Sequence, residues 1–132
     1  MQPKLLLGVL LMIATQAIAN SVDDVRDILK LLLNAPQLAQ YYHFDERPQR
    51  KPLLINNKTT TTINPEGVTA VGETIKIIQG RDKNALEITE LLVDNDKAKV
   101  VFSFQIEGLL GSADFSKHQG IWCLDVINVA EH

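Results

Sequence analysis

The chain has only one cysteine, Cys123. A single cysteine excludes an intramolecular disulfide, so a domain of this size must be stabilised by its hydrophobic core. An unpaired cysteine usually behaves as a small apolar residue, and we therefore expect Cys123 to be buried. Pairing between two chains is the alternative.

An excess of basic side chains is also lacking. The chain carries 13 basic and 16 acidic side chains, and Lys4 is the only charged residue among the first 19. Without that segment, 12 basic residues face 16 acidic ones, a formal charge of −4. Nucleic-acid partners require a basic surface, so this balance predicts that the protein does not bind nucleic acid.

No apolar run is long enough for a membrane anchor. The N-terminal apolar stretch extends from Leu5 to Ala14, whereas a spanning helix needs about 20 residues. Lys4 precedes this stretch and Ala17-Ile18-Ala19 supplies a small-x-small cleavage pattern. We predict a signal peptide over residues 1–19, cleavage after Ala19, a single domain over residues 20–132 and no stable membrane anchor after cleavage. The short Leu-rich signal favours a bacterial periplasmic location, with secretion as the alternative.

Motifs for metal or nucleophilic chemistry are missing as well. There is no paired-cysteine motif and no helical His-Glu-x-x-His, so we predict neither a metal site nor a cofactor. Cys123 and His118 form the only nucleophile and base pair worth considering, but their spacing around a turn does not bring them together. We therefore expect no catalytic residue, although the sequence leaves enzymatic activity open.

What is present begins with a helix. Apolar residues recur at three- and four-residue spacing between Val22 and Leu33, which predicts an amphipathic helix capped by Ser21. Pro36 can open a second helical turn that reaches Tyr41. A polar connection follows from His43 to Pro52, and we expect solvent to surround it.

Short strands are expected next. Leu53-Leu54-Ile55 is suited to a buried strand, and residues 59–63 form a possible second strand. Residues 68–78 combine helical spacing with many β-branched residues, so we predict a loop or helical turn to Val71 and a strand from Glu73 to Gln79.

An antiparallel meander completes the chain. Its predicted strands cover residues 86–93, 98–106, 110–116 and 121–127, with turns at 94–96 and 117–120. In the last strand, Trp122, Leu124 and Val126 should face the core. The opposite face, with Ile121, Cys123, Asp125 and Ile127, is apolar enough to favour contact either with other parts of the fold or with another subunit.

This organisation resembles the nuclear transport factor-like, or cystatin-like, α+β cone superfamily. The resemblance rests on the alternating segment from Ala98 to Phe104, then Glu107-Gly108, then Gly120-Ile121-Trp122. It implies an α+β fold in which the N-terminal helix packs on a curved, mainly antiparallel sheet. The superfamily includes isomerases and dehydratases, accessory domains and immunity proteins, so it implies a shape more than a reaction.

These observations favour an exported, non-enzymatic binding protein, such as an immunity or inhibitor protein that masks a protein partner. A carrier or isomerase/dehydratase-type enzyme that uses the cone cavity is one alternative, and an oligomeric accessory domain, such as a homodimer, is another. The polar connection supplies the candidate partner-binding residues, which are Tyr42, His43, Asp45, Glu46, Arg47 and Arg50.

Overall fold

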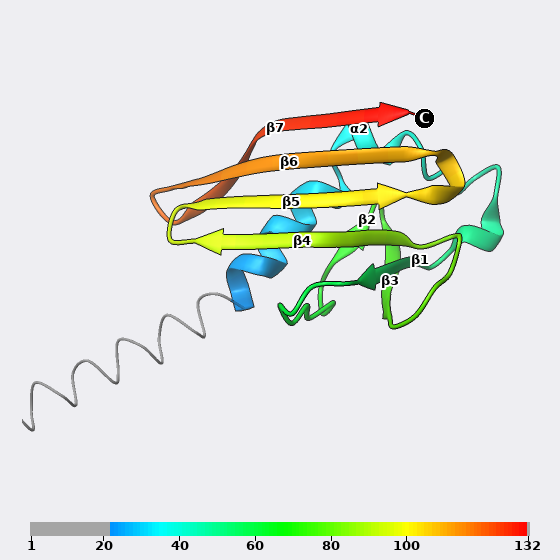
Figure 1. Ribbon diagram of the computed structural model, residues 1–132, viewed down its shortest axis with the longest axis horizontal. Coiled ribbons are helices and arrows are strands. Elements are labelled where there is room, and N and C mark those ends of the chain that lie inside the picture. The colour runs from blue at the N-terminus through cyan, green and yellow to red at the C-terminus, as the bar shows by residue number, and fades with distance from the viewer. Residues whose placement is uncertain (1–21, 132) are drawn as a thin grey trace, which may run out of the picture.

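The computed structural model describes residues 22–131, so the predicted signal peptide and the Ser21 cap lie outside the described residues. A seven-stranded sheet with the order β2-β3-β1-β4-β5-β6-β7 dominates the fold. Figure 1 shows the N-terminal helix crossing behind strands β4 and β5, with β1, β2 and β3 at one edge of the sheet. Across the described part of the chain, no helix is both long enough and apolar enough to span a membrane.

The N-terminal helix covers residues 22–33, as the spacing predicts. Its inward stripe is completely apolar and forms part of the core, whereas Asp23, Asp27 and Lys30 remain exposed. Asp24 fixes one end of this helix to the last hairpin, since its Oδ1 accepts hydrogen bonds from Lys117 Nζ at 3.0 Å and Trp122 Nε1 at 2.9 Å. The inward residues are Val25, Ile28, Leu29, Leu32 and Leu33.

Two short helical pieces follow. Helix α2 spans Pro36–Ala39 and the 3-10 helix η1 spans Pro48–Arg50, each with proline at its start. The connection between them is not fully solvated, and that expectation is wrong at two positions. Phe44 stacks on Tyr42 with ring centroids 5.1 Å apart, and Arg50 is only 5% exposed. Burial of these side chains ties the connection to the core.

The first strands pair partly in parallel. Strand β1 (Leu53–Asn57) runs parallel to both β3 (Glu73–Ile78) and β4 (Leu86–Asp94), while β2 (Thr69–Ala70) pairs antiparallel with β3. The prediction of a strand at residues 59–63 is wrong. The Asn57 side chain accepts from the backbone N–H and hydroxyl of Thr59 and donates to Thr61 O, and these local bonds replace ladder pairing.

The predicted meander is present as β4, β5 (Lys97–Phe104), β6 (Leu109–His118) and β7 (Ile121–Glu131). The 3-10 helix η2 (Gln105–Glu107) joins β5 to β6, and Gly108 continues from it in a left-handed conformation. Alternate residues of β5 enter the core, as the pattern predicts; these are Ala98, Val100, Phe102 and Phe104.

The predicted facing of β7 is wrong beyond Leu124. Phe115 pairs with Leu124 but Asp114 pairs with Val126, so Asp125 is the extra residue of a bulge. The bulge reverses the alternation: Val126 is 47% exposed, whereas Ile127 packs against the core. Cys123 is exposed, so its expected burial is wrong too.

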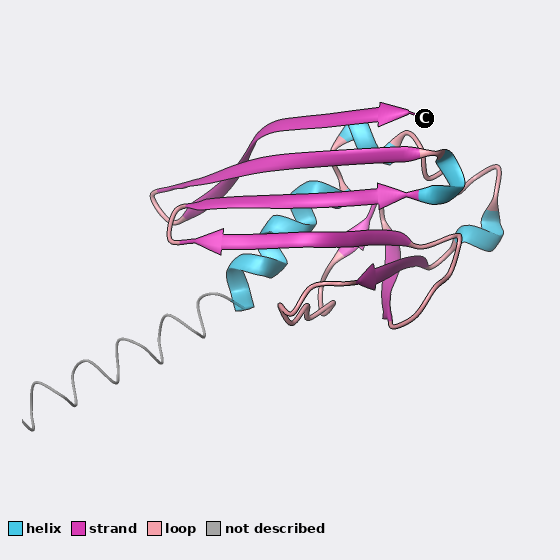
Figure 2. Cartoon of the chain, in the orientation of Figure 1, coloured by secondary structure: helices cyan, strands magenta, loops and turns pink. Residues whose placement is uncertain are grey.

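The fold class is confirmed as α+β, with the N-terminal helix packed on a curved and mainly antiparallel sheet. Figure 2 shows the helices on one side of the long strands β4 to β7. The face of the sheet toward the helices is called the inner face below, and the other face of β4 to β7 the outer face. The inner face and the helices enclose one continuous hydrophobic core.

Candidate functional site

The structure divides the six predicted partner-binding residues into two groups. Tyr42 and Arg50 are interior, at 1% and 5% exposure, so neither offers a free surface. The other four remain accessible, and three of them line a common recess. The accessible residues are His43, Asp45, Glu46 and Arg47, of which Arg47 does not line the recess.

Arg50 holds the backbone of the connection next to this recess. Its Nη1 donates to the carbonyl oxygens of Tyr41 and Tyr42, both at 3.2 Å, and its Nη2 lies 3.1 Å from Glu107 Oε2. The guanidinium also lies over the ring of Phe104, 5.9 Å from its centroid. The other oxygen of Glu107 is 3.1 Å from His43 Nε2. The Glu107 carboxylate on η2 therefore contacts both Arg50 and His43 of the connection.

The tyrosine hydroxyls are occupied in the same region. Tyr42 Oη donates to Leu33 O at 2.8 Å, and burial raises the pKa of Tyr42. Tyr41 Oη donates to Glu131 Oε1 at 2.8 Å, and this hydrogen bond is the main reason why the pKa of Tyr41 is raised above 10.0. Both phenols therefore hold their protons and act as hydrogen-bond donors rather than bases.

The recess itself has a volume of about 350 Å³ and opens between the connection and the tip of the β2–β3 hairpin. Three carboxylates line it, from Asp45, Glu46 and Glu73, and His43 is the only basic side chain among its lining residues. Lys51 lies 3.3 Å from Glu73 and offsets one of these charges. The recess therefore presents an acidic rim to solvent.

Two residues of the recess have unusual backbone conformations. His43 has φ 54° and Val71 has φ 52°, both left-handed. Histidine is among the residues that tolerate this region, but a β-branched valine there is an outlier. Val71 and Gly72 form the two-residue turn of a hairpin whose favoured types accept asparagine or glycine at these positions. Residues held in strained conformations cluster at functional sites.

Asn34 holds this strained tip in place. Its Oδ1 accepts a hydrogen bond from Val71 N at 2.8 Å, and its Nδ2 donates to Thr69 O at 2.9 Å. The side chain of Val71 is nevertheless 56% exposed. The hairpin therefore presents a fixed apolar side chain beside an acidic rim.

Sequence reasoning missed Val71, Glu73 and Glu107 as parts of this region. Val71 and Glu73 lie 25 to 30 residues beyond the recess residues 43–46, and only the pairing of β2 with β3 brings the hairpin tip to them. The dipeptide Val71-Gly72 between two strand-like segments was the available signal, because hairpin turns of two residues favour glycine.

The chemistry that the described residues can perform is limited. Phe102, Phe104, Phe115 and Trp122 are each at most 5% exposed and belong to the packed hydrophobic core. Within residues 22–131, no cluster of three metal-ligating side chains occurs.

His118 is hydrogen-bonded to Ser116 rather than to Cys123. Its Nε2 lies 3.0 Å from Ser116 Oγ, which in turn donates to Asp125 Oδ1 at 2.8 Å. The hydroxyl is thus central, whereas nucleophilic triads require the base in that position.

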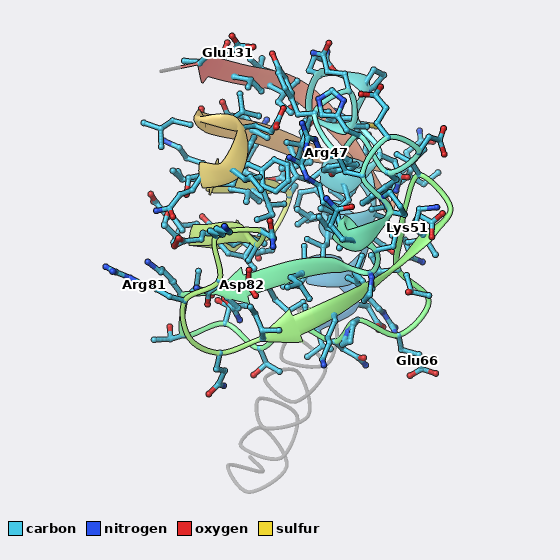
Figure 3. The ribbon with its side chains drawn as sticks, turned by 90° about the vertical axis from the view of Figure 1, so that its right-hand side faces the viewer. Arg47, Lys51, Glu66, Arg81, Asp82 and Glu131 are labelled. Atoms are coloured by element: carbon cyan, nitrogen blue, oxygen red, sulfur yellow. The ribbon has the colours of Figure 1, made fainter. Side chains whose placement is uncertain are left out.

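Figure 3 shows Arg47, Lys51, Glu66, Arg81, Asp82 and Glu131 spread around the end of the fold. A scan against models of protein families finds no match, and searches among curated proteins and solved structures find no similar protein either.

Proposed function

We propose that this protein is an exported, non-enzymatic binding protein that masks a protein partner, as immunity and inhibitor proteins do. One observation carries the proposal: the exposed Val71 is held in a strained left-handed conformation beside an acidic recess. A glycine would relieve that strain, so the valine is best explained by a contact that it makes with another molecule. The helix laid on a curved sheet also supports the proposed kinship with the cone superfamily.

The chemistry of the recess favours a particular kind of partner segment. Asp45, Glu46 and Glu73 attract lysine or arginine, and Val71 offers an apolar contact next to them. Complementary charge speeds association and selects among partners, while burial of an apolar side chain at the contact adds affinity. We propose that a basic segment with a neighbouring apolar side chain docks here. Periplasmic location is favoured and secretion is the alternative.

The test begins with capture of the partner. Tagged protein is recovered from the cell envelope of its own host, and we expect one stoichiometric protein partner. The affinity of that partner is then measured for Val71→Gly and Glu46→Lys. We expect each substitution to weaken binding about tenfold or more, which corresponds to about 1.4 kcal/mol.

Stability separates loss of binding from loss of fold. Val71→Gly removes a left-handed valine, so we expect the free energy of unfolding to stay the same or to rise by about 1 kcal/mol while binding falls. Asp27→Lys, an exposed charge reversal on the N-terminal helix, is the matched control for Glu46→Lys and should leave affinity unchanged. Recovery of no stoichiometric partner, or equal affinities for all three variants, would contradict the proposal.

A further inference from the structure

The outer face is distinct from the recess and is left open by the described chain. Figure 1 shows strands β4 to β7 toward the viewer, with the helices behind them. Large apolar side chains are exposed on this face; they are Leu92 (56%), Leu110 (48%), Ile121 (68%) and Val126 (47%). Open sheet faces with exposed apolar residues often mark interaction surfaces.

One row across this face has a definite chemical order. The register places Leu92 beside Lys99, Lys99 beside Asp114, and Asp114 beside Val126. Read from β4 to β7, the row is therefore apolar, cation, anion, apolar. If the row is laid against its own reverse, each apolar residue meets an apolar residue and each charge meets the opposite charge.

The charges of this region have no ion partner in the described part of the chain. Within residues 22–131, none of the ion pairs involves Lys97, Lys99, Asp94, Asp114 or Asp125, although cations and anions occupy neighbouring strands. The face is also hollowed there, since all five of these charged residues line a recess of about 350 Å³ together with Leu92. Both signs of charge are therefore available for contacts between molecules.

We propose that the outer face binds a second copy of this chain, with Lys99 of each copy against Asp114 of the other. A two-fold axis parallel to the strands and between β5 and β6 produces this contact, because it places β5 over β6 and β4 over β7. The same rotation brings Leu92 over Val126. A two-fold interface requires such a self-complementary patch, in which residue i contacts j and j contacts i.

The charge pattern favours a second copy over other partners. A polyanion or a strongly basic protein would meet repulsion from Asp114 or Lys99 respectively, because the two signs alternate across the face. The axis also places Cys123 over β4 rather than over its own counterpart. The dimer is thus non-covalent, and reducing agents leave it intact.

The size of the face indicates a reversible dimer. Four strands about 4.8 Å apart and four rows of residues cover roughly 500 Å² on each copy. The total of about 1,000 Å² lies at the lower end for specific interfaces. We expect dissociation in the micromolar range, with weaker association at high salt.

Charge exchange between two variants tests the contact directly. Lys99→Glu and Asp114→Lys are purified separately and their masses in solution are measured by sedimentation equilibrium. Each variant alone places like charges opposite each other twice, so we expect a monomer. Mixed in equal amounts, the two variants restore both ion pairs, and we expect a heterodimer with roughly the affinity of the unaltered protein.

Controls keep the test decisive. Circular dichroism shows whether each variant folds, and the recovery of a dimer on mixing could not come from misfolded chains. Lys76→Glu changes an exposed lysine on β3, outside the outer face, and should leave the dimer intact. The proposal is overturned if the unaltered protein is monomeric at millimolar concentration, if reductant dissociates the dimer, if either variant alone still dimerises, or if the mixture stays monomeric.

Discussion

The two faces of the strands β4 to β7 differ in how well their side chains are packed and how many of their polar groups have partners. On the inner face, aromatic and aliphatic side chains fill the core, and two polar side chains reach it: Tyr42 donates to Leu33 O, and Arg50 Nη2 donates to Glu107. On the outer face of the same strands, Leu92 and Val126 are exposed, and Lys99 and Asp114 have no ion partner among the described residues.

This difference separates stability from recognition. Substitutions that disturb the inner face should unfold the protein, because buried groups cannot find new partners. Substitutions on the outer face should leave the fold intact and change association instead, since exposed charges contribute little to stability. The following predictions compare neighbouring positions on this basis, beginning with the largest effect.

Arg50 is the most consequential polar side chain of the interior. Arg50→Ala leaves the carbonyl groups of Tyr41 and Tyr42 without their donor and Glu107 without its nearest cation. Glu107 is only partly buried, at 19% side-chain exposure, so we expect a loss of about 3 kcal/mol, the lower end for a buried ion pair, which urea unfolding measures. The control is Arg47→Ala, an exposed arginine three residues away, with an expected change within about 0.5 kcal/mol. Equal losses for both variants would show that Arg50 is not a buried anchor.

Gly111 and Ser112 compare the two faces at adjacent positions of β6. A Cβ at Gly111 would overlap the ring of Phe102 and come 3.0 Å from Asn128 O, so Gly111→Ala must displace a core aromatic residue. Overpacking of this kind costs about 1–3 kcal/mol. Ser112→Ala, on the outer side, should change the free energy of unfolding by less than about 0.5 kcal/mol. A tolerated Gly111→Ala would mean that Phe102 moves aside at little cost.

The sequence predicts the meander and the N-terminal helix because each carries its own periodicity. Alternation in residues 98–104 and helical spacing in residues 22–33 reflect burial on one side only. It does not predict the facing of Val126, because the bulge at Asp125 depends on pairing with β6. Local bonds from Asn57 likewise override the β-branched run at residues 59–63.

The recess was predictable only in part, for a similar reason. Asp45 and Glu46 are recognisable as an exposed polar segment, but Arg50 reads as equally polar and is buried, with its ion partner Glu107 57 residues away. Val71 looks like an ordinary strand residue until the β2–β3 turn is known. Contacts between distant segments decide which polar residues are surface and which are anchors.

The two tyrosines give the smallest and most local test of this distinction. Tyr41 and Tyr42 are adjacent and are the only tyrosines in the chain. Both have raised pKa values, Tyr41 mainly through its hydrogen bond to Glu131 and Tyr42 through burial. Because the folded protein retains these protons longer, the stabilising contribution is complete below the unfolded pKa of about 10 and is lost as the pH rises through the folded pKa.

Ultraviolet titration of phenolate measures this behaviour one residue at a time. In Tyr42→Phe, we expect Tyr41 to ionise reversibly above pH 10 while the protein stays folded. In Tyr41→Phe, we expect the Tyr42 phenolate to form only together with unfolding, since its hydroxyl is buried and bonded to Leu33 O. Reversible ionisation of Tyr42 in the folded protein would show that solvent reaches this part of the core, and the separation between a sealed inner face and an open outer face would then fail at the connection.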